Sequence, residues 1–464
     1  MIGIICKKLL PLLPATCLCL LTATLTAQPQ KPNIVIIYAD DMGYGDLSSY
    51  GGEIPTPNID HIGSQGIRFT DFYDAAPVCT PSRYSLLTGA CPMRSMHQLT
   101  KALMPADKNY LDRKEVTLAQ YLKQAHYTTA LIGKWHLGQE TPASSPTDFG
   151  FDEFTGFKGG AIDYYYHAYA SLPLDWWVHD RLQQEKGYST DLITQHAIEF
   201  IRNSRPASSP FFLYLAYNAP HYGKTNTDSA GGGYSLSLGD AKKTGANIIN
   251  SLQAPREYVD RFSSIADPYR RVYAAMIASL DDNIGKLIAA LQHDHLLDNT
   301  MIWFISDNGG YSQTLHGHAS NGGLRGEKGS LYEGGIRVPA MVWWQNKIKA
   351  GQMNHTPVCN MDLVPTLAAI TGVSSALHKS TIDGQDIGDL LFHQRPIQRD
   401  LFWQYNGQSA LRSGNWKLIN ASELYDLSAD KEEKTNLAEQ YPAKVTELKE
   451  KMVKAEARIK EDKW

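Results

Sequence analysis

The chain has 464 residues, of which 43% are hydrophobic and 20% are charged, and its formal net charge is −4. These values are ordinary for a globular protein, and they argue against a nucleic-acid-binding protein, which usually carries a basic stripe. The length is too great for one small core, so we expect a large domain accompanied by a smaller one.

The first 27 residues have the pattern of an export signal. Lys7 and Lys8 precede an apolar run over residues 9–25, and small residues lead to Ala27 before the sequence becomes polar. We therefore expect cleavage after Ala27 and an exported protein, either periplasmic or secreted. A retained membrane anchor is the alternative, but prolines interrupt the apolar run, so we expect no stable membrane span.

Three cysteines remain once this signal is removed, namely Cys79, Cys91 and Cys359. That number is odd and too small for a disulfide framework. Whether Cys91 and Cys359 pair is left open by the sequence.

Three continuous apolar runs predict strands buried on both faces, at residues 33–38, 211–217 and 301–306. In open α/β sheets, ligands bind outside the carboxyl ends of the strands, so the residues that follow these runs are candidates for a site. The polar residues found there are Asp40, Asp41, Asn218, His221, Asp307 and Asn308.

Four of these residues, Asp40, Asp41, Asp307 and Asn308, offer only oxygen ligands. Such a set suits calcium or magnesium rather than zinc, which prefers nitrogen and sulfur. Carboxylates brought together repel each other unless a cation lies between them. These residues are therefore candidate ligands of a hard divalent cation; the alternative, and the commoner meaning of such acids alone, is that they only cap turns.

Residues 77–89 read Pro-Val-Cys-Thr-Pro-Ser-Arg-Tyr-Ser-Leu-Leu-Thr-Gly. Pro81 and the apolar spacing after it predict a helix that begins near Cys79, and free N–H groups in a first helical turn attract an anion. Arg83 adds a guanidinium group suited to a tetrahedral oxyanion. A core cysteine beside a helix start is the alternative. The segment resembles the sulfatase signature, Cys-x-Pro-Ser-Arg followed by Leu-Leu-Thr-Gly, without a gap.

Residues 127–138 resemble the second sulfatase signature, Gly-Tyr-x-Thr-x-x-x-Gly-Lys-Trp-His, with His126 in place of the first glycine. Lys134 and His136 are two residues apart on a segment that we predict to be extended, so they should point to the same side. The positive charge of Lys134 and the titrating imidazole of His136 can then contact the same ligand. The alternative is a solvated strand end.

The segment over residues 157–188 is crowded with Tyr, Trp and His and lacks clear periodicity. Because it follows Lys134 and His136, we expect it at the rim of the site, with aromatic faces against a sugar. A satellite core under a long loop is the alternative. The predicted sugar contacts are Asp163, Trp176, Trp177 and His179.

Residues 322–335 resemble the sulfatase loop Lys-x-x-x-x-Glu-Gly-Gly, which delivers Lys328 to the sulfate. The segment is not a nucleotide-binding P-loop, because the GxxxxGK[ST] spacing is absent and no helix signal follows. Arg325 in this loop and His316 and His318 before it are further predicted substrate contacts, although two histidines in a polar loop often have no ligand.

The composition changes after residue 372. Residues 401–405, 416–419 and 424–427 predict short strands, and residues 444–460 predict an amphipathic helix. We expect a small antiparallel sheet with a covering helix.

The motifs together resemble formylglycine-dependent sulfatases of the arylsulfatase and N-acetylgalactosamine-6-sulfatase type. This resemblance implies an alkaline-phosphatase-like α/β fold with a central mixed sheet flanked by helices. We divide the chain into a signal peptide over residues 1–27, a catalytic domain over residues 28–375 and a C-terminal subdomain over residues 376–464.

The resemblance also implies a mechanism. In this family the motif cysteine is oxidised to formylglycine (3-oxoalanine) by a formylglycine-generating or anaerobic sulfatase-maturing enzyme, and the hydrate attacks the sulfate sulfur. Cys79 is then the modified residue and also a ligand of calcium, with magnesium as the alternative ion. The family assigns protonation of the leaving oxygen to His221 or Lys328. The implied catalytic residues are Cys79, Arg83, Lys134, His136, His221 and Lys328.

We expect the substrate to be a sulfated glycan or an aryl sulfate, with galactose or N-acetylgalactosamine units as the first choice. One alternative is a phosphodiesterase or phosphonate hydrolase of the same superfamily. Another is an inactive sulfatase-like protein that binds sugar, although every catalytic residue implied by the resemblance is present.

Overall fold

The structure is a computed structural model, and it describes residues 1–3, 31–139, 144–203, 206, 209–225, 233–240, 248–374, 377 and 381–461. The region from Lys31 to Trp464 is one compact unit. Residues 4–30 of the predicted export signal and the predicted domain boundary at residues 375 and 376 lie outside the described residues. No helix in the described part of the chain is both long and apolar enough to cross a membrane.

Within the described residues, the centre of the unit is a ten-stranded mixed sheet in the order β14-β2-β13-β12-β1-β8-β4-β5-β6-β7. Its parallel central strands are β12 (Thr300–Ser306), β1 (Asn33–Ala39), β8 (Phe211–Ala216), β4 (Thr128–Lys134) and β5 (Glu153–Phe157). The outer strands are β14 (Gln352–Asn354), β2 (Ile67–Phe69), β13 (Ala340–Trp344), β6 (Trp177–Val178) and β7 (Arg181–Leu182). Every residue of β1, β8 and β12 is buried, which explains why these strands are apolar without alternation. The three predicted strands are confirmed to within one residue at each end.

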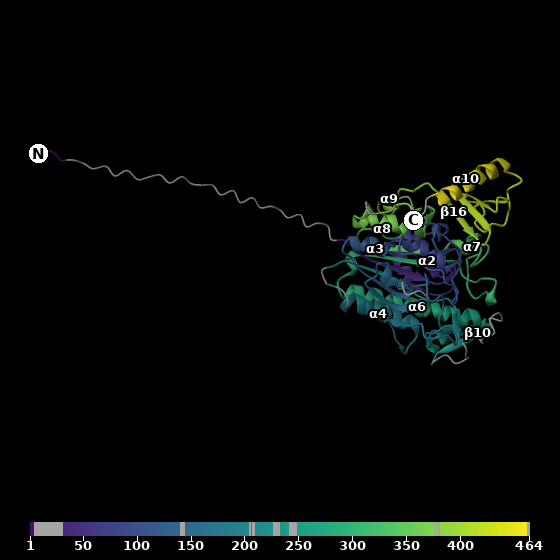
Figure 1. Cartoon of the computed structure of the whole chain (residues 1–464), viewed down its shortest axis with the longest axis horizontal. Helices are drawn as coiled ribbons and strands as arrows, with labels where there is room; N and C mark the ends of the chain where they lie inside the picture. Colours follow the sequence, from purple (N-terminus) through teal and green to yellow (C-terminus); the bar gives the residue numbers. More distant parts are fainter. Residues whose placement is uncertain are drawn as a thin grey trace. The chain divides into compact units, whose positions relative to one another are not determined.

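Helices cover both faces of this sheet (Figure 1). One layer contains α1 (Pro57–Ser64), α4 (Ser189–Asn203) and α6 (Pro268–His293). The other contains α2 (Cys79–Thr88), α3 (Leu118–Gln124), α8 (Leu363–Thr371) and α9 (Gly388–His393). Side chains alternate along β1, so Val35 and Ile37 join the first layer while Ile34 and Ile36 join the second. One strand therefore contributes to two separate apolar cores.

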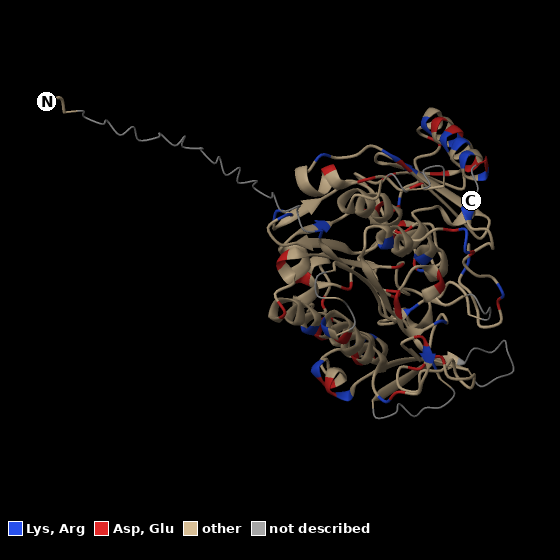
Figure 2. Ribbon diagram, turned by 60° about the vertical axis from the view of Figure 1, so that its left-hand side comes forward, with Lys and Arg blue, Asp and Glu red and all other residues tan. Residues whose placement is uncertain are grey.

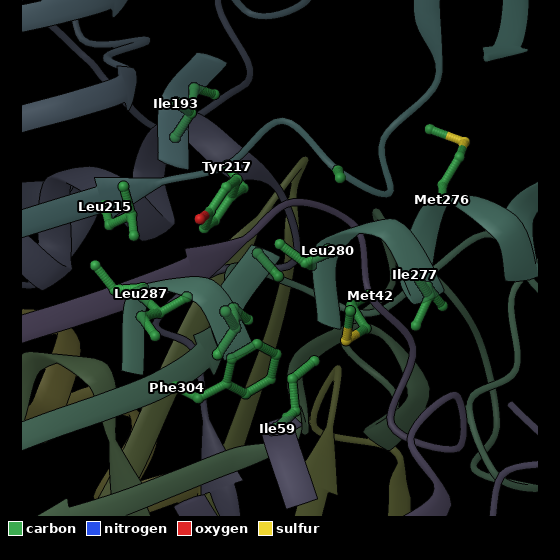
Figure 3. Close-up of a cluster of buried hydrophobic side chains, with 14 of the residues drawn as sticks. Met42, Ile59, Ile193, Leu215, Tyr217, Met276, Ile277, Leu280, Leu287 and Phe304 are labelled. Atoms are coloured by element: carbon green, nitrogen blue, oxygen red, sulfur yellow. The ribbon is translucent and has the colours of Figure 1, made fainter. Parts of the chain in front are cut away.

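The core on the α6 side is drawn in Figure 3. Leu280 and Leu287 of α6 belong to the same buried cluster as Leu215 of β8 and Phe304 of β12. Burying one such side chain contributes roughly 1.5–3 kcal/mol, so this layer fixes the sheet whose strand ends carry the candidate site residues.

A glycine pair lets β4 pack tightly between its neighbours. Gly133 and Gly156 have φ values of 114° and 146°, which strongly favour glycine. A Cβ atom on Gly133 would lie 1.9 Å from the carbonyl oxygen of Ala216, and one on Gly156 would lie 2.0 Å from that of Gly133. Only glycine fits at these two paired positions, one of which directly precedes Lys134.

Three smaller sheets accompany the large one in the described part of the unit. The order of the first is β10-β11-β9. It contains β9 (Gly223–Thr225), β10 (Tyr234–Asp240) and β11 (Ile249–Ala254), and β11 is followed by α5 (Arg256–Arg261). The second is a parallel pair of β3 (Phe72–Tyr73) and β15 (Val358–Cys359).

Near the end of the chain, the described residues form a four-stranded antiparallel sheet and a covering helix. They comprise β16 (Asp400–Tyr405), β17 (Gln408–Ser413), β18 (Trp416–Ile419), β19 (Glu423–Asp426) and α10 (Pro442–Glu461). Val445, Leu448 and Met452 of α10 pack on the sheet, while acidic and basic residues are mixed over the rest of the helix (Figure 2). The predicted sheet and helix are confirmed, but β17 was not predicted because its sequence holds only two adjacent apolar residues.

A buried charge cluster joins β18 to the short helix α7 (Glu333–Ile336). The Lys417 ammonium lies 2.8 Å from carboxylate oxygens of both Glu333 and Glu433, and all three side chains are completely buried. Glu333 also pairs with Arg337 at 3.1 Å. Burial raises the pKa of Glu433; burial also acts to raise that of Glu333, but Lys417 and Arg337 bring it below its ordinary value. The cluster thus fixes the C-terminal sheet to the segment that follows Lys328.

Candidate active site

The structure brings together residues from four strand ends at the carboxyl edge of the parallel sheet. Asp40 and Asp41 follow β1, Lys134 ends β4, and His221 lies just beyond β8. Asp307 and Asn308 follow β12, and the Asp41 N–H donates a hydrogen bond of 3.0 Å to Asp307 Oδ1. Adjacent parallel strands end side by side, so residues far apart in sequence meet there.

Cys79 is the first residue of α2, and its neighbour Val78 is the N-cap. Pro81 occupies the third helical position, which is tolerated because N–H groups of the first turn have no helical partner. Arg83 is completely buried one turn later, and its Nη2 lies 2.9 Å from Asp307 Oδ2 and 3.6 Å from Asp40 Oδ1. The helix therefore presents Cys79 at its start and fixes Arg83 against the carboxylates.

Two lysines neutralise the aspartates that follow β1. Lys134 Nζ donates to Asp40 Oδ2 at 2.6 Å, and Lys328 Nζ donates to the two oxygens of Asp41 at 2.6 and 2.8 Å. Burial acts to raise the pKa of Asp40, but Lys134 and the neighbouring basic groups bring it below its ordinary value. Burial, and then the charge of Asp40, raise the pKa of Asp307 well above its ordinary value.

A metal ion fits the oxygen atoms of this cluster. Among the described residues, Asp40, Asp41 and His221 offer ligand atoms that lie within 4.8 Å of one another. Asp40 Oδ1 and Asn308 Oδ1 are buried and have no hydrogen-bond partner in the described part of the chain. A buried oxygen without a partner costs roughly 1–3 kcal/mol, and more when it is charged, so a hard cation between these atoms would remove that cost. Of the predicted ligands, Cys79 and Asp307 are not members of the three-residue group.

Cys79, His136, His221 and Lys328 line one cavity of about 290 Å³. Arg83 and Lys134 are completely buried behind it and reach the aspartates instead. The remaining wall combines four tyrosines with aliphatic and small residues and one further basic residue. It includes Leu103, Met104, Tyr169, Tyr222, Lys224, Tyr311 and Tyr405.

His136 reaches the cavity by a backbone turn rather than by strand alternation. β4 ends at Lys134, and His136 has a φ of 57°, so the prediction that the two residues share an extended segment was wrong. The His136 Nε2–H donates to the carbonyl oxygen of Leu103 at 2.9 Å, and Nδ1 has no partner among the described residues. Burial, followed by the charge of Lys134, lowers the pKa of His136 well below its ordinary value. A neutral imidazole with a free Nδ1 lone pair can accept a proton.

His221 is held by its own loop. Its Nδ1–H donates to the carbonyl oxygen of Tyr222 at 2.6 Å, and its Nε2 lies 3.5 Å from Asp41 Oδ2. Burial lowers the pKa of His221 to about 3, so the ring is neutral at pH 7 and Nε2 carries a lone pair. That atom is directed toward the carboxylate cluster.

The predicted sugar contacts of the aromatic segment do not line the cavity that contains Cys79. Asp163 accepts hydrogen bonds from the N–H groups of Tyr165 and Tyr166, and Trp176 is completely buried. Trp177 lies beneath Lys158, whose Nζ is 3.8 Å from the ring centroid. His179 is more than half exposed, beside Glu153. Their role in substrate binding stays a prediction.

The other three predicted contacts also lie outside that cavity lining. His316 stacks on Tyr269 with ring centroids 3.8 Å apart, and the His318 Nδ1–H donates to the carbonyl oxygen of Leu315 at 2.7 Å. Arg325 donates to the hydroxyl of Tyr425 at 2.8 Å and lines a separate, wider cavity. His316 and Arg325 thus contact α6 and β19, and His318 contacts its own loop.

Several residues that line the cavity were missed by the sequence analysis. Tyr222 and Lys224 lie one and three residues after His221, so their closeness to it in sequence was an available signal. Tyr405 lies in β16 of the C-terminal sheet, and no local pattern connects it with Cys79.

Comparisons with known proteins agree with this arrangement. A family model described as Sulfatase matches residues 32–373, and one described as N-sulphoglucosamine sulphohydrolase, C-terminal, matches residues 326–460. The N-acetylgalactosamine-6-sulfatase of Rattus norvegicus is 33% identical over 89% of this chain and 74% of its own length. Arylsulfatase A of Homo sapiens is 31% identical over 84% of this chain and 75% of its own length.

A solved structure, Ps i-CgsB in complex with k-i-k-neocarrahexaose, has the same fold. Its TM-score is 0.80 at 31% sequence identity, and the match covers 94% of this chain and 95% of that one. The similarity confirms the predicted alkaline-phosphatase-like class, with a central mixed sheet and a small antiparallel sheet. With the match to the Sulfatase model over most of its length, this chain belongs to the sulfatase family and is a sulfuric ester hydrolase.

Proposed function

We propose that this chain is an exported sulfatase that removes sulfate from a sulfated glycan through a nucleophile made from Cys79. The observation that carries the proposal is the shared cavity, in which the Cys79 side chain at the start of α2 meets His136, His221 and Lys328. These residues combine a nucleophile position, a proton acceptor and positive charge in one enclosed space.

The nucleophile requires modification of Cys79. Direct attack of a thiolate on sulfur would leave an intermediate with no easy exit. Formylglycine at this position supplies, in its hydrated form, one hydroxyl for attack and a second whose proton loss expels sulfate. The N–H groups of the first turn of α2, together with Arg83 behind them, favour negative charge beside position 79.

Asp40, Asp41 and Asn308 would hold a calcium ion, with magnesium as the alternative. Asp40 Oδ1 and Asn308 Oδ1, which accept no hydrogen bond from the described residues, support this assignment. Such an ion supplies positive charge that favours the ionised form of the nucleophile. Asp307 contributes by holding Arg83 and by accepting the backbone N–H of Asp41.

Residues that line the cavity can accept and donate the protons that the reaction requires. The free Nδ1 of His136 can accept a proton, because the Nε2–H is committed to Leu103. Between the two candidates for protonating the leaving oxygen, the Nδ1–H of His221 is already donated to Tyr222. Lys328 carries several N–H groups and faces the cavity, so it is the favoured donor.

The saccharide is proposed to contain galactose or N-acetylgalactosamine. Support comes from the relative named N-acetylgalactosamine-6-sulfatase and from the solved complex of Ps i-CgsB with k-i-k-neocarrahexaose. The aromatic wall formed by Tyr169, Tyr222, Tyr311 and Tyr405 suits the C–H faces of a sugar ring.

The test uses protein produced together with a sulfatase-maturing enzyme. Mass spectrometry of the peptide around Cys79 should detect formylglycine, and the protein should release sulfate from N-acetylgalactosamine 6-sulfate. Cys79→Ala should abolish release without lowering the melting temperature markedly, because the change removes one sulfur atom and leaves Val78, the N-cap of α2, unchanged. The matched control is Cys91→Ala, which removes another buried thiol outside this cavity and should keep activity. Substantial sulfate release by Cys79→Ala would reject the proposed nucleophile.

A further inference from the structure

Lys224 is a buried basic residue in the wall of the candidate active site. It lies in β9, it is only 8% exposed, and it lines the same cavity as Cys79 and Lys328. Its backbone is fixed on both sides, since its N–H donates to Ile162 and its carbonyl oxygen accepts from Ala170. The side chain therefore has a defined position.

The Lys224 ammonium group is surrounded by aromatic rings and one amide. Its Nζ lies 4.9 Å from the ring centroid of Tyr222 and 5.5 Å from that of Tyr169. Among the described residues it donates one hydrogen bond, to the amide oxygen of Asn250 across the β9–β11 pair. An ammonium group has three N–H donors, so two remain for a ligand.

The other basic residues of the site differ from Lys224. Arg83, Lys134 and Lys328 each pair with a carboxylate, at 2.9, 2.6 and 2.6 Å respectively. Lys224 forms no ion pair with any carboxylate in the described part of the chain. A buried charge without a counter-charge is costly, and an uncharged side chain would serve equally well as a partner for Asn250. The hydrogen bond to Asn250 therefore does not explain why the residue at this position is charged.

We propose that Lys224 is a specificity-determining residue that binds a second anionic group, a sulfate or a carboxylate, on the substrate. This inference rests on the proposed function, because the first anionic group is the sulfate ester cleaved at position 79. The cavity of about 290 Å³ contains both Cys79 and Lys224 in its wall, so the second anion lies on the same sugar or on the adjoining one. Tyr169 and Tyr222 exclude water around the ammonium group and strengthen its attraction for an anion.

The test compares three substrates with wild type and Lys224→Gln. They are N-acetylgalactosamine carrying one sulfate, the same sugar carrying two sulfates, and a disaccharide of the monosulfated sugar with a uronic acid. Removing a charge-assisted hydrogen bond at a buried position such as Lys224 should lower kcat/KM by about 10- to 100-fold. We expect that loss only for the substrate whose second anion Lys224 binds, and near-equal rates for the monosulfated sugar. Loss confined to the disulfated sugar identifies a sulfate, and loss confined to the disaccharide identifies a carboxylate.

Equal effects of Lys224→Gln on all three substrates, or no effect on any, would overturn the inference and leave Lys224 with a structural role. Lys286→Gln, which removes a lysine exposed on α6, controls for the change in net charge. Failure of the proposed function has a different signature, because wild type would then release sulfate from none of the three substrates. Melting temperatures of both variants show whether the fold has been kept.

Discussion

At the scale of single residues, the pKa of Lys224 gives an independent way to examine its role. Burial, and then the nearby charge of Lys328, lower this pKa to about 8. The ammonium form is therefore present below about pH 8 and is lost as the pH rises through that value. We expect the preference of the wild type for a doubly anionic sugar to fall over this range. Ratios of kcat/KM for the two sugars, measured on either side of pH 8, check the prediction, and a similar fall in Lys224→Gln would contradict it.

Stability should change in the opposite direction. In an unfolded chain a lysine keeps its proton up to about pH 10.4, so between about pH 8 and that value the unfolded state binds more protons than the folded one. Stability of the wild type should therefore rise with pH relative to Lys224→Gln. The same residue that improves recognition of an anion thus destabilises the folded protein at neutral pH.

A site residue could be predicted from the sequence where it lies in a continuous local motif. The motifs around Cys79, Lys134 and Lys328 are continuous in sequence, and the structure brings these residues to one edge of the sheet. The orientation of His136 could not be predicted, because its positive φ depends on contacts that close the turn after β4. Lys224 lies near His221 in sequence, but the sequence does not show that no carboxylate among the described residues pairs with it.

At the scale of secondary-structure elements, Lys417 in β18 should be essential to the attachment of the C-terminal sheet. Lys417→Met leaves the carboxylates of Glu333 and Glu433 buried without their shared cation. Breaking a buried ion pair in this way costs about 3–5 kcal/mol, so we expect a large fall in the midpoint of urea unfolding. The control is Lys434→Met, since Lys434 is exposed and its pair with Glu432 should contribute little. Equal midpoints for the two variants would show that the cluster does not stabilise the interface.

The elements themselves were predictable where one physical signal dominated. Continuous apolar runs identified β1, β8 and β12, and helical periodicity identified α10. Strand β17 was not predicted, because Gln408 to Ser413 is mostly polar. The preceding Asn406 and Gly407, both at positive φ, are nevertheless typical of a hairpin turn. Hydrogen bonding to β16 and β18 stabilises β17 as a strand, although its own sequence has no strand pattern.

At the scale of the whole molecule, a bound cation should stabilise the native state. Calcium at about 100 times its dissociation constant would add about 2.7 kcal/mol to the free energy of unfolding. Asn308→Ala removes the partnerless Oδ1 without changing any charge, so it should greatly reduce this response. Melting temperatures with calcium and with a chelator measure the effect, and Asn415→Ala, at an exposed turn, is the control. An unreduced calcium response in Asn308→Ala would place the ion elsewhere.

The order of strands in the large sheet has a consequence for how the chain acquires its structure. Strand β1 is made first but lies between two strands made much later. Asn33 bonds to Phe211, which is 178 residues away, and to Thr300, which is 267 residues away. Pairings so distant close large loops, and such contacts slow folding because chain entropy is lost before they form. The apolar strand β1 therefore cannot complete its pairing until more than half of the chain has been synthesised. A nascent chain shorter than about 300 residues should need a chaperone to avoid aggregation.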